Sequence, residues 1–122
     1  MFKHLTIIVA FVITLSSPVV AQDLQKGYAA YNAGDYATAF KMLMPVAKAG
    51  NADAQFQIGS MYQYGRGVPQ DYKGAVKWYR LASHQGDFLS QLALGFMYER
   101  GMGVLQDNVM SHMWYNIGAA SG

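Results

Sequence analysis

The sequence predicts an all-α protein built from antiparallel helix pairs that stack in one direction. The chain repeats itself, because the segments that begin at Gly65 and Gly101, 36 residues apart, share Gly-x-Gly-Val, Gln-Asp and Trp-Tyr. Apolar residues in each repeat recur every three or four positions, as on the buried side of a helix. Glycine and aspartate separate these segments, where helices would end and begin. A repeat of this length indicates units that are stabilised by their neighbours.

The first segment, residues 1–21, has the pattern of a secretory signal peptide. Lys3 and His4 precede an apolar run from Leu5 to Leu15, and small residues follow up to Ala21. The apolar run is shorter than the roughly 20 residues that span a bilayer. We therefore expect cleavage after Ala21, no membrane span after cleavage, and export to the periplasm or beyond, most simply in a Gram-negative envelope. An uncleaved N-terminal anchor is the alternative.

Residues 22–50 are expected to form a degenerate first repeat with helices at about 24–33 and 36–49. Asp35, Tyr36, Ala39 and Gly50 lie 36 residues before Asp71 and its matched neighbours. The loop between the two helices is shortened to Asn-Ala-Gly-Asp and lacks Gly-x-Gly-Val.

Residues 51–86 form the second repeat, with helices expected at 52–64 and 72–85. Gly59 should let a neighbouring helix come close, and Gly65 should end the first helix in a left-handed conformation. Asp71 is placed to accept the free N–H groups of the second helix. That helix has a buried stripe of small, large, large and small side chains, namely Ala75, Trp78, Tyr79 and Ala82.

Residues 87–122 form the third repeat, with helices expected at 88–100 and 108–120. The positions that define the repeat are Gly59, Tyr62, Gly65, Gly67, Asp71, Ala75, Trp78 and Tyr79, then Gly95, Tyr98, Gly101, Gly103, Asp107, Trp114 and Tyr115. No polar closing helix follows the third repeat. Two explanations stay open: a partner or second copy covers this C-terminal repeat, or the chain is a shortened form of a longer array.

These matched positions are similar to those of the Sel1-like repeats, relatives of the tetratricopeptide repeats. The resemblance is specific over residues 52–122 and looser over 24–50. It implies a right-handed α-solenoid that acts as a scaffold and presents a concave surface to a protein or peptide. Some exported relatives have a cysteine pair in every repeat and are linked to cell-wall compounds. This chain has no cysteine, so we do not transfer those properties.

Composition excludes several other functions. The formal net charge is +2 and falls to +1 without Lys3, too little to attract nucleic acid. Without cysteine there is no disulfide, thiolate or Cys-metal site. His84 and His112 fall at different points of their helices, and Glu99 is the only glutamate. We therefore expect no catalytic residue, metal or cofactor. Binding or hydrolysis of peptidoglycan-related compounds remains the alternative function.

The expected partner-binding surface lies on the first helix of each repeat. Its candidate residues are Gln57, Met61, Tyr64, Ala93, Met97 and Arg100. Met61 and Met97 attract attention because exposed, flexible thioethers suit a partner of variable shape. The alternative is that both methionines are packed between adjacent helices.

Overall fold

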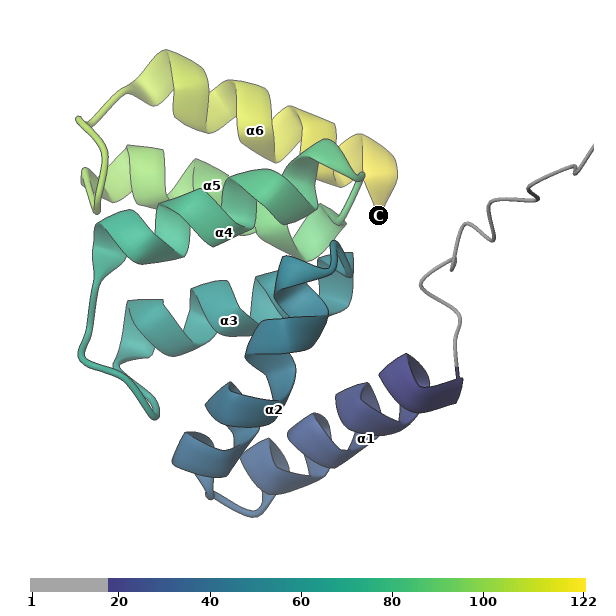
Figure 1. The fold of residues 1–122 in the computed structure, drawn as a ribbon. Helices are drawn as coiled ribbons and strands as arrows, with labels where there is room; N and C mark the ends of the chain where they lie inside the picture. The colour runs from purple at the N-terminus through teal and green to yellow at the C-terminus, as the bar shows by residue number, and fades with distance from the viewer. Residues whose placement is uncertain (1–17) are drawn as a thin grey trace, which may run out of the picture.

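The computed structural model describes residues 18–122, which form six α-helices and no strand (Figure 1). Most of the predicted signal peptide, residues 1–17, lies outside the described residues. The helices are α1 (Pro18–Asn32), α2 (Tyr36–Lys48), α3 (Ala52–Tyr64), α4 (Tyr72–His84), α5 (Phe88–Arg100) and α6 (Asn108–Ser121). None of them is both long and apolar enough to cross a bilayer.

The described part of helix α1 starts at Pro18, so residues ahead of the expected start at Leu24 are also helical. Val20 and Leu24 pack against the first core cluster, so the added turn is supported by apolar contact. The predicted cleavage after Ala21 falls inside this helix and stays a prediction.

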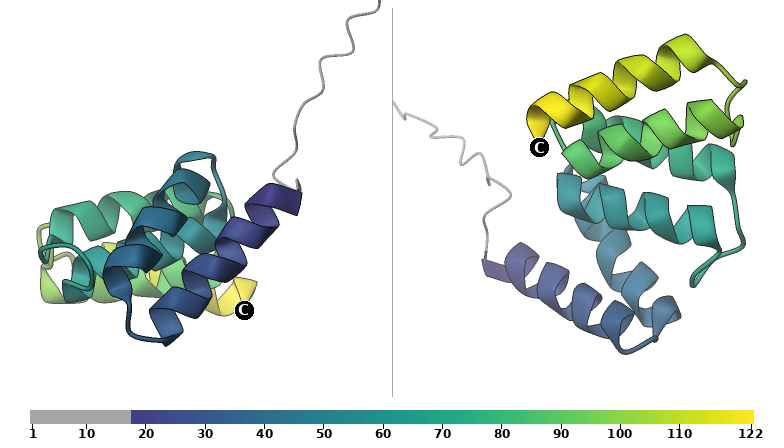
Figure 2. Two further views of the ribbon diagram at one scale, coloured as in Figure 1. Left: turned by 60° about the horizontal axis from the view of Figure 1, so that its bottom comes forward. Right: turned by 180° about the vertical axis from the view of Figure 1, so that it is seen from behind.

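The helices pack in chain order. Helices α1 and α2, α3 and α4, and α5 and α6 form three pairs, while α2–α3 and α4–α5 contacts join one pair to the next. Figure 2 shows α1, α3 and α5 on one side of the stack. Because contacts run between consecutive helices, the stack depends on how each pair fits the pair before it.

The predicted helix boundaries rest on the expected caps. Asp71 Oδ1 accepts the N–H of Gly74 at 3.0 Å, and Asp107 Oδ1 accepts that of Met110 at 3.0 Å. Gly65 and Gly101 end α3 and α5 in the left-handed region, both with φ of 65°. Each cap satisfies backbone groups that a helix end leaves free.

Glycine lets the two helices of each pair approach closely, as predicted. A Cβ on Gly59 would lie 2.7 Å from the Tyr79 ring, and one on Gly95 would lie 2.6 Å from the Tyr115 ring. Gly27 has the same role against Leu43 in the first pair, where a Cβ would lie 2.5 Å away. The sequence comparison missed Gly27 because the shortened loop places it 32, not 36, residues before Gly59.

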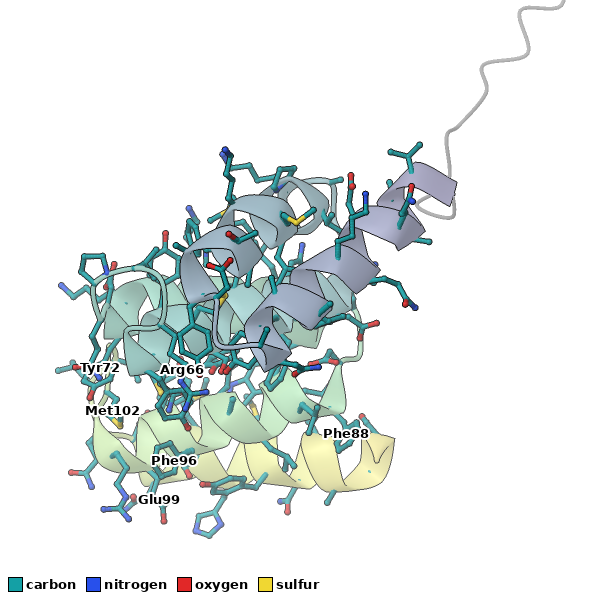
Figure 3. The ribbon with its side chains drawn as sticks, turned by 90° about the horizontal axis from the view of Figure 1, so that it is seen from below. Arg66, Tyr72, Phe88, Phe96, Glu99 and Met102 are labelled. Atoms are coloured by element: carbon teal, nitrogen blue, oxygen red, sulfur yellow. The ribbon has the colours of Figure 1, made fainter. Side chains whose placement is uncertain are left out.

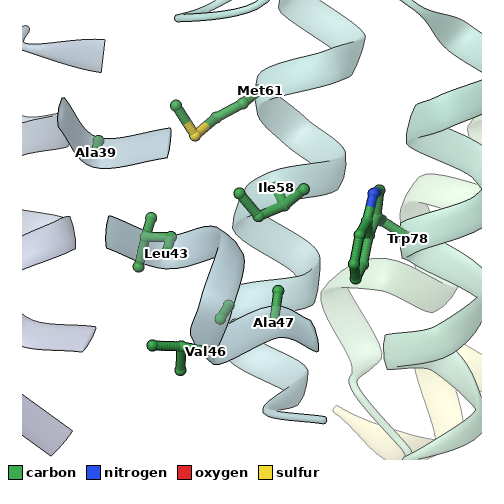
Figure 4. Packing of buried hydrophobic residues seen from close by; sticks show 8 residues of the cluster. Ala39, Leu43, Val46, Ala47, Ile58, Met61 and Trp78 are labelled. Atoms are coloured by element: carbon green, nitrogen blue, oxygen red, sulfur yellow. The ribbon is translucent and has the colours of Figure 1, made fainter. Parts of the chain in front are cut away.

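Two core clusters fill the space between pairs. The first joins α2, α3 and α4 through residues that include Leu43, Ile58 and Trp78 (Figure 4). The second joins α4 and α5 through Tyr79 and Leu94. Trp78 is 8% exposed, which confirms its place in the core.

Two glutamines repeat one hydrogen bond at the joints between pairs. Gln55 Nε2 donates to the carbonyl of Ala47 at 3.1 Å, and Gln91 Nε2 donates to that of Ser83 at 3.3 Å. Each bond runs from a first helix to the last turn of the preceding second helix. It therefore adds a second hydrogen bond to a carbonyl of the last helical turn, which in α2 already accepts the backbone N–H of Gly50 and in α4 that of Gly86.

The loop glycines let each loop approach the backbone of the preceding pair. Gly67 packs on the backbone carbonyl of Tyr36, and Gly103 packs on that of Tyr72. Their φ angles are 76° and 70°. A side chain at either position would both strain the loop and strike a helix backbone, so only glycine fits.

Replacing Trp78 with alanine tests this packing. We expect Trp78→Ala to lower the free energy of unfolding by about 3–5 kcal/mol, because it empties a site among three helices. Trp114, at the same repeat position but partly exposed, is the matched control, and Trp114→Ala should cost less. Urea denaturation followed by circular dichroism measures both. Equal losses for the two variants would contradict this packing.

Candidate functional site

The structure corrects one part of the predicted binding surface. Met61 and Met97 have no exposed surface, so the prediction that they face a partner is wrong. Met61 packs in the first core cluster and Met97 in the second. The first helix of each repeat turns this side toward the preceding pair, and the flexible methionine fills the gap there. The alternative reading, that both are packed between helices, is therefore confirmed.

The other four candidates lie at the surface to different degrees. Tyr64 is 59% exposed and Arg100 is also exposed, and both occupy the last position of their helices. Gln57 and Ala93 are partly buried. A partner could reach the ends of α3 and α5 most easily, and the binding role of these four residues stays a prediction.

The most distinctive surface feature is a group of three tyrosines around one arginine. We call Tyr31, Tyr36, Tyr64 and Arg66 the tyrosine–arginine cluster. The guanidinium carbon of Arg66 lies 5.8 Å from the ring centre of Tyr31, 5.5 Å from that of Tyr36 and 5.4 Å from that of Tyr64. Arg66 Nη1 also donates a hydrogen bond to the Tyr31 hydroxyl. Figure 3 shows Arg66 in the view of the stack from below.

Local structure explains how Arg66 reaches the first pair. Arg66 follows the left-handed Gly65, and its backbone N–H donates to Met61 O at 2.9 Å, which closes the end of α3. Tyr31 lies in the last turn of α1 and Tyr36 begins α2. Since Gly67 packs on the Tyr36 backbone, the loop is held where Arg66 meets these tyrosines.

Contacts with tyrosine side chains raise the pKa of the Arg66 guanidinium. The hydrogen bond with Tyr31 is the largest cause that raises the pKa of its guanidinium, and proximity to Tyr36 and Tyr64 adds to it. Within residues 18–122 no carboxylate forms an ion pair with Arg66. The cation thus stays charged and is held by neutral aromatic groups, which attract it through their ring faces.

The third repeat has a different arrangement at the same place. Met102 stands where Arg66 does, and Arg100 stands where Tyr64 does. The guanidinium carbon of Arg100 lies 5.6 Å from the Phe96 ring centre. The ends of α3 and α5 thus have aromatic and cationic side chains at the surface. The two repeats differ at these positions, because packing does not require the same residue in both.

Three other tyrosines, the buried Tyr79 on α4 and the partly buried Tyr115 on α6 and Tyr28 on α1, have structural roles. The Tyr79 hydroxyl donates to Gln63 Oε1 at 2.6 Å, and Tyr115 donates to Glu99 Oε2 at 3.0 Å at the matching position. Burial raises the pKa of Tyr79, and burial with Glu99 raises that of Tyr115. Burial, with Asp53 and Asp87 nearby, raises the pKa of Tyr28 to about 12. These phenols stay neutral under ordinary conditions.

Other polar groups do not converge into a reactive centre in the described chain. Residues 18–122 hold no group of three or more His, Cys, Asp or Glu side chains placed for a metal. His84 ends α4, as expected, and its ring lies edge-on to Trp114 at 6.4 Å. A shallow groove of about 450 Å³ lies beside the α5–α6 loop and is lined by Lys73, Gly101, Gly103, Val104 and Leu105.

Sequence reasoning identified Tyr64 but missed the rest of the cluster. The signal was present in the repeat itself: Arg66 is matched by Met102, although both lie between two invariant glycines. Tyr31 could not be placed, because the shortened first loop shifts its helix out of the 36-residue register. Contacts between adjacent pairs decide this site, and repeat spacing alone does not show them.

Comparison with protein-family models finds the Sel1 repeat at residues 52–87 and again at 89–122. The two matches together cover more than half of the chain. A search of curated protein sequences found no match.

Three solved structures are similar to the chain. A Sel1 repeat protein from Oxalobacter formigenes is 39% identical with a TM-score of 0.70, over 71% of this chain and 25% of its own. A protective antigen of uropathogenic Escherichia coli with an SLR fold is 36% identical with a TM-score of 0.78, over 84% and 23%. Cysteine-rich protein B of Helicobacter pylori is 16% identical with a TM-score of 0.67, over 88% and 93%, and shares the fold. The chain thus spans about a quarter of the first two proteins.

Proposed function

The chain belongs to the Sel1 repeat family, and on this premise we propose that it is a non-catalytic scaffold that binds a protein or peptide in the bacterial envelope. Sel1 repeats generally mediate protein interaction and form helical solenoids. The binding surface in this proposal is the exposed ends of α3 and α5, with the tyrosine–arginine cluster beside them.

The observation that carries the proposal is the exposed set of aromatic and arginine side chains. Tyrosine and arginine are enriched among the residues that dominate binding energy in protein interfaces. Tyr64, Arg66 and Arg100 are not matched by the same residue in the neighbouring repeat. Stacking of repeats therefore does not require them, and a role toward a partner explains why they are there.

Export is the second part of the proposal. The apolar segment ahead of residue 22 has the order of basic, apolar and small residues that a signal peptidase substrate needs. The Escherichia coli relative is described as a protective antigen, which suits a protein that reaches the cell surface or its surroundings. We propose the periplasm or the outside of the cell as the location.

Selection from random peptides displayed on phage tests the binding proposal. We expect enriched peptides whose binding is lost in a Tyr64→Ala, Arg100→Ala double variant, because it removes the exposed ring and cation at the two helix ends. A Lys41→Ala, Lys48→Ala variant is the control, since both lysines are exposed on α2 and neither belongs to this surface. Failure to enrich any peptide would contradict the scaffold proposal. Equal binding of the enriched peptides to both variants would contradict the assignment of the binding site to this surface.

A second interaction, self-association through α6, has its own supporting observation. Val76 on α4 is 3% exposed because α5 covers that helix, while the matching His112 on α6 is exposed. Trp114 and Tyr115 are likewise less buried than Trp78 and Tyr79. We therefore propose that the uncovered side of α6 contacts a second copy.

Light scattering coupled to gel filtration measures this association. We expect a dimer that Ala119→Arg converts to a monomer, because Ala119 is exposed on the uncovered side of α6. Val109→Arg is the matched control, since Val109 occupies the position of the exposed Lys73 in α4 and should leave the dimer intact. A monomeric wild-type chain would contradict self-association.

A further inference from the structure

We propose that the tyrosine–arginine cluster recognises an acidic side chain of a bound peptide, with the Arg66 guanidinium as the group that contacts the carboxylate. This inference rests on the proposed scaffold function and names the chemical class of its partner. The occupant is an extended peptide that bears aspartate or glutamate beside apolar residues.

The charge of Arg66 favours an acidic ligand. Arg66 forms no ion pair within residues 18–122. A guanidinium has five N–H donors, and the structure uses one of them, on the neutral hydroxyl of Tyr31. The remaining donors match a carboxylate, which accepts two parallel hydrogen bonds from arginine. At the end of α5, Arg100 has its guanidinium carbon 5.6 Å from the Phe96 ring centre and forms no ion pair within residues 18–122.

The Arg66 side chain is also preorganised for binding. Three rings from two helix pairs hold the Arg66 side chain, each with its centre within 5.8 Å of the guanidinium carbon. A side chain that is already fixed loses less conformational entropy when it binds a ligand. The same rings offer apolar surface next to the cation, and Tyr64 is 59% exposed. The cluster therefore suits an acidic residue with apolar neighbours.

The internal repeats separate this role from a purely structural one. At the second joint Met102 occupies the place of Arg66 and packs against the second core cluster, so the joint needs an apolar contact at this position but no positive charge. The second joint is held without an arginine, through Gly103 on the Tyr72 backbone. The positive charge of Arg66 is thus available to a ligand.

The test is a titration, followed by NMR, of the protein purified from cells that express residues 1–122. Two probes have equal length and apolar content, the N-acetylated and C-amidated peptides (Gly-Glu-Leu)3 and (Gly-Gln-Leu)3. We expect the glutamate peptide to shift the Arg66 Nε–H and the backbone amides near Tyr64. The glutamine peptide should bind at least tenfold more weakly, and added salt should reduce the difference.

Variants assign the effect to Arg66. Arg66→Met should abolish the preference for glutamate, whereas the matched control Arg80→Met should keep it. Arg80 also donates to a tyrosine, Tyr98 at 2.8 Å, and its removal changes the net charge equally. Tyr31→Phe removes the hydroxyl that accepts from Arg66 and frees that donor, so the preference should persist. If Arg66 only holds the helix pairs together, the wild-type protein and every variant should bind the two peptides equally well.

Three results would overturn the inference: equal binding of the two peptides, equal loss in Arg66→Met and Arg80→Met, or no shift at the cluster. If phage selection meanwhile yields neutral or basic peptides that bind at Tyr64 and Arg100, the scaffold function stands and only the acidic partner is wrong. If selection yields no peptide either, the scaffold function itself fails.

Discussion

The contact of each loop glycine with the backbone of the preceding pair controls both the stack and its surface. Gly67 on Tyr36 and Gly103 on Tyr72 bring the α3–α4 and α5–α6 loops onto the start of α2 and α4. The contact is possible because glycine has no Cβ and adopts positive φ without strain. The same joints also contain the glutamine hydrogen bonds and the core clusters that connect neighbouring pairs.

The same contact positions the surface that we propose to bind a partner. Arg66 immediately precedes Gly67, so the close approach of Gly67 to Tyr36 brings the guanidinium among rings from α1, α2 and α3. The two repeats share Gly67 and Gly103 but differ at Arg66 and Met102, and at Tyr64 and Arg100. A repeat protein can thus vary its binding chemistry at a loop without altering the packing that supports the loop.

Most of the fold follows from the sequence, because local signals decide it. Capping aspartates, left-handed glycines and apolar stripes act within one helix or turn, and the expected boundaries of α2 to α6 lie within a residue of those observed. The site was harder to predict from the sequence, because it depends on contacts between helix pairs. Met61 and Met97 were misplaced because spacing does not show which side of a first helix meets the preceding pair. Arg66 was missed because Tyr31 lies outside the regular register.

The measurement that tests this account most directly is the stability of Gly67→Ala against that of Gly34→Ala. Both glycines have positive φ, 76° and 79°, but a Cβ at Gly34 would meet nothing within 4 Å, whereas one at Gly67 would strike the Tyr36 backbone. Both variants share the cost of a positive φ, about 1–2 kcal/mol, and overpacking adds about 1–3 kcal/mol at Gly67 alone. Urea denaturation should therefore show the larger loss for Gly67→Ala, and equal losses would contradict the account.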